Sequence, residues 1–181
     1  MNDIDPTTAD LDEEEGRAGD NTGAGDVEVV VEVAEVDLIQ VGLDSGVICL
    51  SEDGSRIRYV ARGKEYSFHD PEEKIRAAAY VELIERYKYD PQDMDTEVAP
   101  PRREPKLPAD IVVYQRGSDK AFMAVETKAE ETEGKIDEAR REGLGNAMLL
   151  DAKYLWLVCG TEKFAFNVTA RLTCPRKLVH S

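Results

Sequence analysis

The residues best suited to chemistry are Glu126 and Lys128, which are separated by one position inside an otherwise apolar segment. This segment is typical of a buried strand, where charged side chains are rare unless they are paired or functional. Side chains two positions apart on a strand project from the same face, so this carboxylate and this amine lie side by side and Thr127 points the other way. If residues 110–114 pair antiparallel with this strand, Asp110 falls opposite the neighbourhood of Ala124 to Glu126. We therefore expect two carboxylates and a lysine at one end of a hairpin.

Such a set suits the hydrolysis of a phosphodiester. That reaction needs a divalent cation to offset the phosphate charge, oxygen ligands to hold the cation, and a group that orients or deprotonates the attacking water. Asp110 and Glu126 would supply the ligands. Lys128 would contact the water or the phosphate, and Glu73 would complete the shell directly or through a water. A Glu-x-Lys pair on a strand, taken alone, is equally compatible with a solvated ion pair.

The element that positions Glu73 is a helix that begins at Pro71. Asp70 supplies an N-cap, Pro71 takes the first helical position, and a glutamate follows three residues after the cap. We expect this helix to run to about Lys88. Its apolar stripe begins at Ala77 and Glu73 lies one turn before it, so we expect the carboxylate on the buried face. The capping box offers an alternative role, in which Glu73 reaches back to the backbone of Asp70.

Strand patterns surround these motifs. Residues 27–43 are ambiguous between strand and helix, and their valines favour a strand. Asp53-Gly54 lies between two apolar runs within residues 46–61, which indicates a hairpin, and a short strand follows at 66–68. Beyond the helix the pattern predicts strands at 96–98, 110–114 and 121–129, a helix at 133–151, and strands at 154–159 and 163–168. This order implies an α/β sandwich around a mixed sheet.

Length and charge restrict the possible partners. A chain of 181 residues with 41% apolar residues suits one domain with a real core and a tail. The net charge of -15 argues against a nucleic-acid partner, because phosphates attract basic residues. However, residues 1–40 contain 13 acidic residues and one base, Arg17, so the rest of the chain is near neutral and remains compatible with DNA. An acidic surface suited to a high-salt host would explain the same charge.

The cellular setting follows from what the sequence lacks. Residues 1–26 are acidic and almost free of large apolar side chains, so we expect a disordered leader. Three cysteines far apart in the sequence argue against a disulfide framework. No apolar run reaches the length of a membrane span, and the N-terminus has no signal-sequence pattern. We expect a cytoplasmic protein with no membrane partner.

Two groups of motifs resemble known nucleases. Leu-Pro-Ala-Asp at 107–110, a strand, and then Glu-Thr-Lys at 126–128 resemble the PD-(D/E)XK nuclease signature. More narrowly, Asp-Pro-Glu-Glu-Lys-Ile-Arg at 70–76, a long helix, a Tyr-Lys-Tyr-Asp turn, Ala-Asp-Ile-Val-Val-Tyr and Ala-Val-Glu-Thr-Lys-Ala are similar to the N-terminal nuclease domain of type I restriction enzyme R subunits. The resemblance covers about residues 45–168.

The resemblance implies a restriction-endonuclease-like αβββαβ core with a mixed central sheet, preceded by a small β-rich extension. It implies a type I restriction-type deoxyribonuclease with magnesium as its cofactor and with DNA and a methylase or translocase subunit as its partners. The implied catalytic residues are Asp110, Glu126, Lys128 and the helix acid Glu73, and the implied metal ligands are Asp110 and Glu126. The expected divisions of the chain are a leader (1–26), an extension (27–69), a nuclease-like domain (70–168) and a tail (169–181).

Basic residues near these motifs are candidates for contacts with the DNA backbone, namely Arg102, Arg103, Lys106, Arg140 and Arg141. A proline-rich turn with three bases, such as the one that holds the first three, is more often a solvated loop. The last two equally suit pairing with Asp137 in their own helix. Family members commonly carry a glutamine and a tyrosine four positions apart in this helix, where the present chain has Glu142 and Asn146.

Two functions stay open. The first is a magnesium-dependent DNA endonuclease domain of a restriction-modification system, which the complete acid, acid and lysine set favours. The second is a catalytically inactive nuclease-like module that binds DNA or a methylase or translocase partner. The altered motif in the second helix and the low net basicity favour the second.

Overall fold

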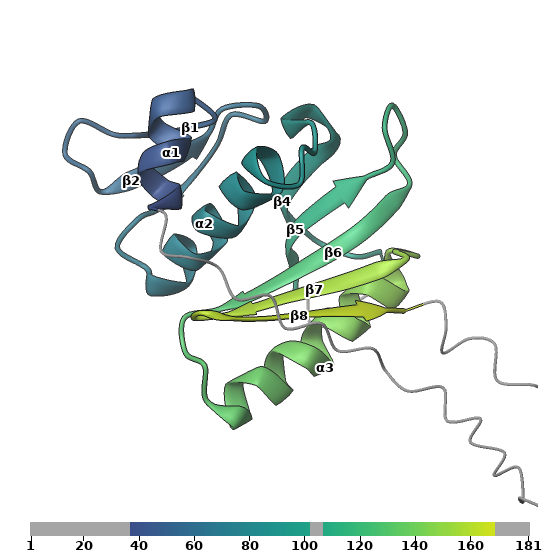
Figure 1. Ribbon diagram of the computed structural model, residues 1–181. Coiled ribbons are helices and arrows are strands. Elements are labelled where there is room, and N and C mark those ends of the chain that lie inside the picture. Colours follow the sequence, from purple (N-terminus) through teal and green to yellow (C-terminus); the bar gives the residue numbers. More distant parts are fainter. Residues whose placement is uncertain (1–36, 102–106, 169–181) are drawn as a thin grey trace, which may run out of the picture.

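The computed structural model describes residues 37–101 and 107–168 of the chain (Figure 1). The elements in chain order are α1 (Leu38–Ser45), β1 (Ile48–Leu50), β2 (Arg56–Tyr59), β3 (Lys64–Ser67), α2 (Pro71–Glu85), the short 3-10 helix η1 (Pro91–Asp93), β4 (Met94–Val98), β5 (Ala109–Tyr114), β6 (Ala121–Lys128), α3 (Glu133–Leu149), β7 (Tyr154–Cys159) and β8 (Glu162–Asn167). The succession α2, β4, β5, β6, α3, β7 confirms the predicted αβββαβ core. None of the helices in the described part of the chain is long and apolar enough to cross a membrane.

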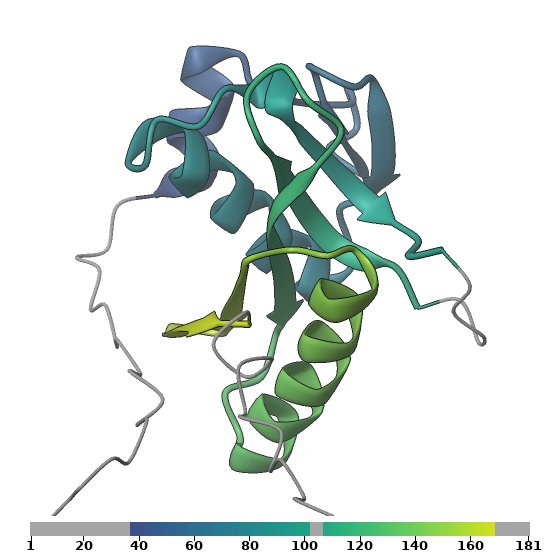
Figure 2. The same cartoon turned by 90° about the vertical axis from the view of Figure 1, so that its right-hand side faces the viewer.

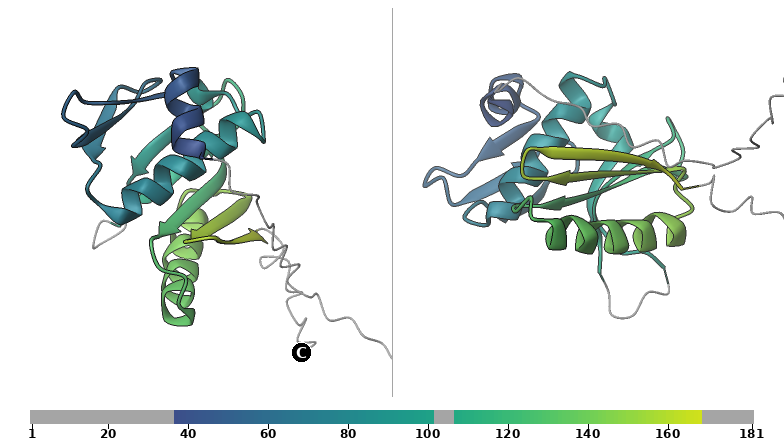
Figure 3. Two further views of the ribbon diagram at one scale, coloured as in Figure 1. Left: turned by 60° about the vertical axis from the view of Figure 1, so that its left-hand side comes forward. Right: turned by 60° about the horizontal axis from the view of Figure 1, so that its bottom comes forward.

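The core is a mixed sheet of five strands in the order β4-β5-β6-β7-β8. Neighbouring strands pair antiparallel except β6 and β7, which are parallel and are joined by the crossover helix α3. Helix α3 lies along one face of the sheet (Figure 3), and α1 and α2 lie on the other side (Figure 2). The three antiparallel strands β1, β2 and β3 form a separate small sheet beside α1 and α2. Strand β6, which carries Glu126 and Lys128, is therefore the centre of the α/β fold.

Two hydrophobic cores lie on the two faces of the main sheet. Val125 belongs to the core under α2, which also contains Ile57 from the small sheet, whereas its neighbour Ala124 belongs to the core under α3. This alternation is the side-chain periodicity of a strand covered on both faces. Helix α3 approaches closely because Gly143 faces the sheet, where an added Cβ would lie 2.7 Å from Leu155 Cδ1. The small sheet and the main sheet thus share one of the two cores.

Helix α2 starts where the sequence predicts. The side chain of Asp70 accepts a hydrogen bond from the Glu72 backbone N–H at 2.9 Å, and Pro71 occupies the first turn. The helix ends at Glu85, and the chain leaves it through Lys88, whose φ of 61° is in the left-handed region that favours glycine. The helix predicted to run to about Lys88 therefore ends slightly earlier than expected.

A buried ion pair joins α2 to the edge strand β8. Lys163 Nζ makes a short contact with Glu82 Oε2, and the two residues are 7% and 1% exposed. The same ammonium lies 6.0 Å from the ring centroid of Trp156, and Arg86 Nη1 lies 3.4 Å from the other oxygen of Glu82. Each buried charge is thus compensated, as burial requires.

The strand interpretation of residues 27–43 is wrong for the described part, because Leu38–Ser45 is a helix capped by Asp37. The buried face of this helix contains Gly42, where an added Cβ would lie 2.4 Å from Val81 of α2. Close packing against α2 outweighs the strand propensity of the local sequence, because propensities are weak compared with tertiary contacts.

Some expectations fall on parts of the chain that the structure does not describe. The leader (1–26), residues 27–36 and the tail (169–181) lie outside the described residues. The proposed division of the chain into four parts therefore stays a prediction.

Candidate functional site

Asp110 and Glu126 lie at the same end of the hairpin formed by β5 and β6. The antiparallel register pairs Ile111 with Val125, which places Asp110 opposite Glu126, one position beyond the last regular pair. Asp110, Glu126 and Lys128 are 9%, 4% and 9% exposed. The sequence-predicted hairpin therefore brings these three charged side chains to one end of the central strands, inside the protein.

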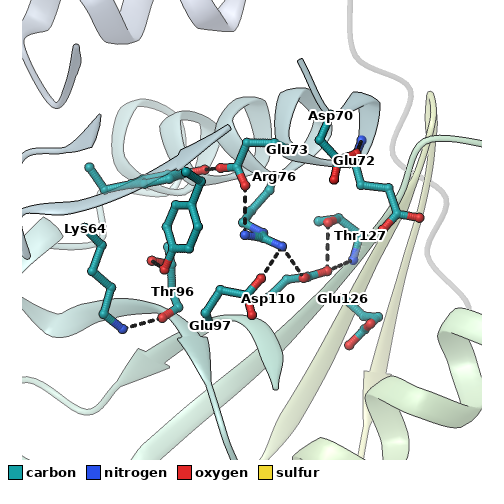
Figure 4. Close-up of polar contacts among 12 residues, drawn as sticks. Lys64, Asp70, Glu72, Glu73, Arg76, Thr96, Glu97, Asp110, Glu126 and Thr127 are labelled. Carbon is teal, nitrogen blue, oxygen red and sulfur yellow. Dashed lines mark hydrogen bonds and ion pairs between the residues drawn. The ribbon is translucent and has the colours of Figure 1, made fainter. Parts of the chain in front are cut away.

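The Asp110 carboxylate accepts hydrogen bonds from neighbouring groups at the position where the pairing of β5 with β6 ends. Its Oδ2 accepts from the backbone N–H of Thr127 at 2.6 Å and from the Thr127 hydroxyl at 2.7 Å. Its Oδ1 accepts from Arg76 Nη2 at 2.9 Å. Figure 4 shows this carboxylate between the arginine and the threonine, while the Glu126 carboxylate points away from both. Asp110 thus links strand β6 to helix α2.

Arg76 is the centre of the charge network on the α2 side. Its guanidinium pairs with Glu73 Oε2 at 2.9 Å, with Asp110 Oδ1, and through a short contact with Glu97 Oε1. It also lies over the ring of Tyr66, 5.3 Å from the centroid. Burial lowers the pKa of Arg76, but the charges of the three carboxylates outweigh it and raise the pKa above its ordinary value. One buried cation therefore contacts acids from α2, β4 and β5.

Glu73 is buried on α2 as predicted, with 4% of its surface exposed. Its Oε1 accepts a short hydrogen bond from the Tyr59 hydroxyl, and its Oε2 faces Arg76. Burial raises the pKa of Glu73 above its ordinary value, against the opposing effects of Tyr59 and Arg76. These contacts replace the capping-box contact with the Asp70 backbone that the sequence offered as an alternative.

Glu126 and Lys128 face α3 instead. Lys128 Nζ lies 3.7 Å from Glu126 Oε1 and 3.0 Å from Glu142 Oε2, and Asn146 Nδ2 donates to Glu126 Oε2 at 3.4 Å. Glu142 and Asn146 are the two positions where the second helix departs from the motif common in the resembled family. Both positions therefore contact candidate catalytic side chains directly.

The charge of Asp110 affects the ionisation of Glu126. Burial and the nearby charge of Asp110 raise the pKa of Glu126 to about 9, although Lys128 acts in the opposite direction. Burial lowers the pKa of Lys128, but its hydrogen bond to Glu142 and the charge of Glu126 raise it above the ordinary value, so the amine stays protonated. Glu126 is thus a buried acid that lacks sufficient positive charge around it.

This electrostatic deficit is the property expected of a cation site. Asp110 and Glu126 supply carboxylate oxygens, the ligands that magnesium prefers. A divalent cation between them would stabilise the ionised form of Glu126, so the chemistry of these donors fits the ion. In the observed side-chain arrangement, however, the described residues contain no group of three or more His, Cys, Asp or Glu placed to hold a metal. Asp110 Oδ1 would have to exchange Arg76 for the ion.

The candidate DNA contacts divide into two groups. Arg102, Arg103 and Lys106 lie outside the described residues. In α3, Arg140 Nη1 lies 3.9 Å from Asp137 and Arg141 Nε donates to the Asp137 carbonyl at 3.3 Å. Arg140 also lies 5.4 Å from the ring centroid of Phe166. The intrahelical contacts that the sequence offered as an alternative are therefore formed.

Sequence reasoning missed three participants of the site. Arg76 lies three positions after Glu73, and this helical spacing was a usable signal. Thr127 was recognised only as pointing away from Glu126, yet its hydroxyl and N–H hold Asp110. Glu97 has a φ of 50°, which is uncommon for a non-glycine residue, and no sequence pattern indicated it.

The fold and the buried charges together define an α/β domain with a charged site at one end of its central strands. The family model described as the N terminus of type I restriction enzyme R protein matches residues 71–173, and the chain belongs to this family. The match begins at the first residue of α2 and includes Glu73, Asp110, Glu126 and Lys128. Among curated proteins, none matches the sequence.

Proposed function

We propose that this chain is a magnesium-dependent DNA endonuclease domain of a restriction-modification system, with a PD-(D/E)XK type of active site. The observation that carries the proposal is the pair of buried carboxylates, Asp110 and Glu126, on adjacent central strands, with Lys128 next to Glu126. The raised pKa of Glu126 supports it, because strongly perturbed acids at a converging set of charges are typical of functional sites. Family membership supports DNA and other subunits of a restriction complex as partners. Such a complex acts in the cytoplasm.

The roles of the side chains follow from their charges. A bound magnesium ion would supply charge neutralisation at the scissile phosphate and a more acidic water. Asp110 and Glu126 would hold it, and Glu73 is positioned by Tyr59 and Arg76 at the edge of the same site. Lys128 remains cationic between Glu126 and Glu142, so it can attract the phosphate or orient the attacking water.

Arg76 would determine when Asp110 is available. Its guanidinium compensates Asp110 and Glu73 in the described arrangement, so release of Asp110 requires only that Arg76 retain Glu73 and Glu97. The Thr127 hydroxyl and N–H would keep the other oxygen of Asp110 in place. One carboxylate oxygen is thus fixed while the other can change partner.

A second candidate function is a catalytically inactive module that binds DNA or a methylase or translocase subunit. The observation that favours it is the complete use of Asp110, with Oδ1 paired to Arg76 and Oδ2 hydrogen-bonded to Thr127. The contact of Lys128 with Glu142 favours it as well, because it occupies the amine that catalysis would need. In this function the same charges would be purely structural.

Plasmid cleavage distinguishes the two functions. The full chain, alone and with its partner subunits, is incubated with supercoiled DNA in magnesium, manganese or calcium at a fixed salt concentration, because DNA binding depends steeply on salt. We expect Lys128→Ala and Asp110→Ala to lower the cleavage rate by about a hundredfold or more while DNA affinity changes little. Lys135→Ala, which removes an exposed lysine of α3, is the matched control and should cleave normally.

Circular dichroism establishes that each variant is folded before its rate is compared. If the wild-type complex binds no divalent ion and never nicks DNA, the endonuclease proposal fails. Retained DNA or subunit binding in that case would establish the binding module in its place.

A further inference from the structure

A second concave surface lies at the opposite end of the main sheet from the acidic site. Its cavity of about 660 Å³ is lined at the end of α2, at the turn between β5 and β6, and at the start of β7. We call it the basic-aromatic pocket and define it by Lys88, Tyr89, Arg116, Phe122 and Lys153. The length of β6 separates it from Lys128 by about 20 Å, at roughly 3.3 Å per residue. The pocket therefore shares no residue with the candidate active site.

Aromatic rings form the floor of this pocket. The rings of Tyr89 and Phe122 lie 6.3 Å apart between centroids, and Phe122 and Tyr154 lie 5.2 Å apart in an edge arrangement. Tyr89 and Phe122 line the cavity, Tyr154 packs against Phe122, and all three side chains are only half-buried. Half-exposed rings that converge on a cavity suit the stacking of a planar base.

Cations form its rim. Lys88, Arg116 and Lys153 are exposed, and within residues 37–101 and 107–168 no carboxylate forms an ion pair with any of them. Lys153 Nζ lies 5.0 Å from the ring centroid of Tyr154. Two acids also line the cavity, but Asp90 accepts from the Gln92 N–H at 2.9 Å and Asp93 accepts from the Gly117 N–H at 3.2 Å. The two acids are thus hydrogen-bonded to backbone N–H groups, and the three cations are available to contact a ligand.

The backbone at Lys88 gives independent support. Lys88 occupies the left-handed position at the end of α2, where glycine is the least strained residue. Its N–H donates to the Ile84 carbonyl at 3.1 Å, so the conformation is fixed by the helix end. A lysine held at a position that favours glycine points to a use for its side chain.

We propose that the basic-aromatic pocket binds a nucleoside phosphate, with the base stacked on Tyr89 and Phe122 and the phosphate contacted by Lys88 and Arg116. The ligand is either a free nucleotide or a nucleotide of a single DNA strand, because the two present the same base and phosphate. Cavities of about 300–1,000 Å³ are typical of sites for molecules of this size. This site is separate from the proposed endonuclease centre and does not depend on it.

The test measures binding of the full chain to deoxyadenosine monophosphate by calorimetry and to a fluorescein-labelled decathymidine strand by anisotropy. Lys88→Gly is the most informative variant, because it removes the charge while glycine relieves the left-handed backbone. We expect Lys88→Gly and Arg116→Ala each to weaken binding by about fivefold and to reduce its salt dependence. Phe122→Leu, which keeps an apolar side chain but removes the ring, should weaken binding by about tenfold.

Arg58→Ala is the matched control, because it removes an exposed cation from the small sheet and should leave binding unchanged. If deoxyadenosine monophosphate displaces the labelled strand, the pocket binds nucleotides in general. If it does not displace the strand, the pocket binds nucleotides only within a DNA strand. Binding that Lys88→Gly, Arg116→Ala and Phe122→Leu leave unchanged would overturn the proposal, as would equal competition by inorganic phosphate. Asp110→Ala should bind the nucleotide and the strand as the wild type does, because Asp110 is not part of the basic-aromatic pocket. A failure of the endonuclease proposal would therefore not affect this binding.

Discussion

The raised pKa of Glu126 makes the stability of the protein depend on pH in an unusual direction. Burial and Asp110 raise this pKa to about 9, from an ordinary value of 4.5. The folded state therefore keeps a proton on Glu126 at pH values where the unfolded state has lost it. The stabilisation from this proton is fully present below pH 4.5, and it is lost progressively as the pH rises towards 9.

Replacement of this acid by its neutral amide tests the effect. Between pH 6 and pH 8 one proton difference lowers the free energy of unfolding of the wild type by about 1.4 kcal/mol per pH unit, or about 3 kcal/mol in total. Glu126→Gln has no proton to lose, and its carbonyl oxygen can still accept from Asn146. The variant should therefore gain about 3 kcal/mol relative to wild type over this range, which is about 10 °C in Tm for a domain of this size.

Thermal unfolding followed by circular dichroism at pH 6, 7 and 8 without divalent ions measures this difference. Glu52→Gln is the control, because Glu52 is exposed in the hairpin turn of the small sheet and its curve should run parallel to wild type. All other titrating groups are common to wild type and variant, so they cancel in the comparison. Parallel wild-type and Glu126→Gln curves between pH 6 and pH 8 would refute the reasoning that Glu126 is protonated in the metal-free fold.

Three further changes test the packing and the buried charges. Lys163→Met should lower the free energy of unfolding, measured by urea titration, by about 3–5 kcal/mol, because it leaves Glu82 buried without the Lys163 ammonium. The double variant Glu82→Leu/Lys163→Met should recover most of this loss. Gly143→Ala should cost about 1–3 kcal/mol in the same assay, because its Cβ would lie 2.7 Å from Leu155 Cδ1, and an unchanged midpoint would show that α3 can move away. Arg76→Met should destabilise by about 3–5 kcal/mol at pH 8 and by less at pH 4, because burial raises the pKa of Glu73 and its protonation removes one of the unpaired charges; equal losses at both pH values would contradict the charge argument.

The core of the fold was predictable because its elements carry local signals. The Asp70-Pro71 start of α2 and the continuous apolar run of β7 are such signals, and both elements appear where they were expected. Residues 38–45 were misinterpreted because their helical state depends on Gly42 packing against α2, a contact between segments about forty positions apart. Tertiary contacts of this kind leave no periodic pattern in a short segment.

The residues of the candidate site could be predicted from the sequence, but the residues that hydrogen-bond or pair with them could not. Alternation on β6 and the hairpin register are local rules, and they correctly placed Asp110 opposite Glu126. The partners of Asp110 could not be foreseen, because its carboxylate accepts hydrogen bonds from Thr127 on β6 and from Arg76 on α2, which is 34 positions earlier in the sequence. The hydrogen-bond partners of a side chain beyond the last strand pair depend on where the regular pairing stops. Residue spacing in the sequence does not predict that position.

The ion pair between Glu82 and Lys163 has a consequence for the synthesis of the protein. Its partners are 81 positions apart, and Lys163 belongs to the last strand of the sheet. During translation α2 emerges long before β8, so an early burial of Glu82 would leave it with only Arg86, which is about half exposed, and without the buried ammonium of Lys163. We expect docking of α2 to wait for β8, although β6 with its Glu-Thr-Lys sequence is already complete. Glu73 and Arg76 also lie on α2, so they reach the acidic site only when α2 docks. We therefore expect the site to be assembled only after β8 has been synthesised.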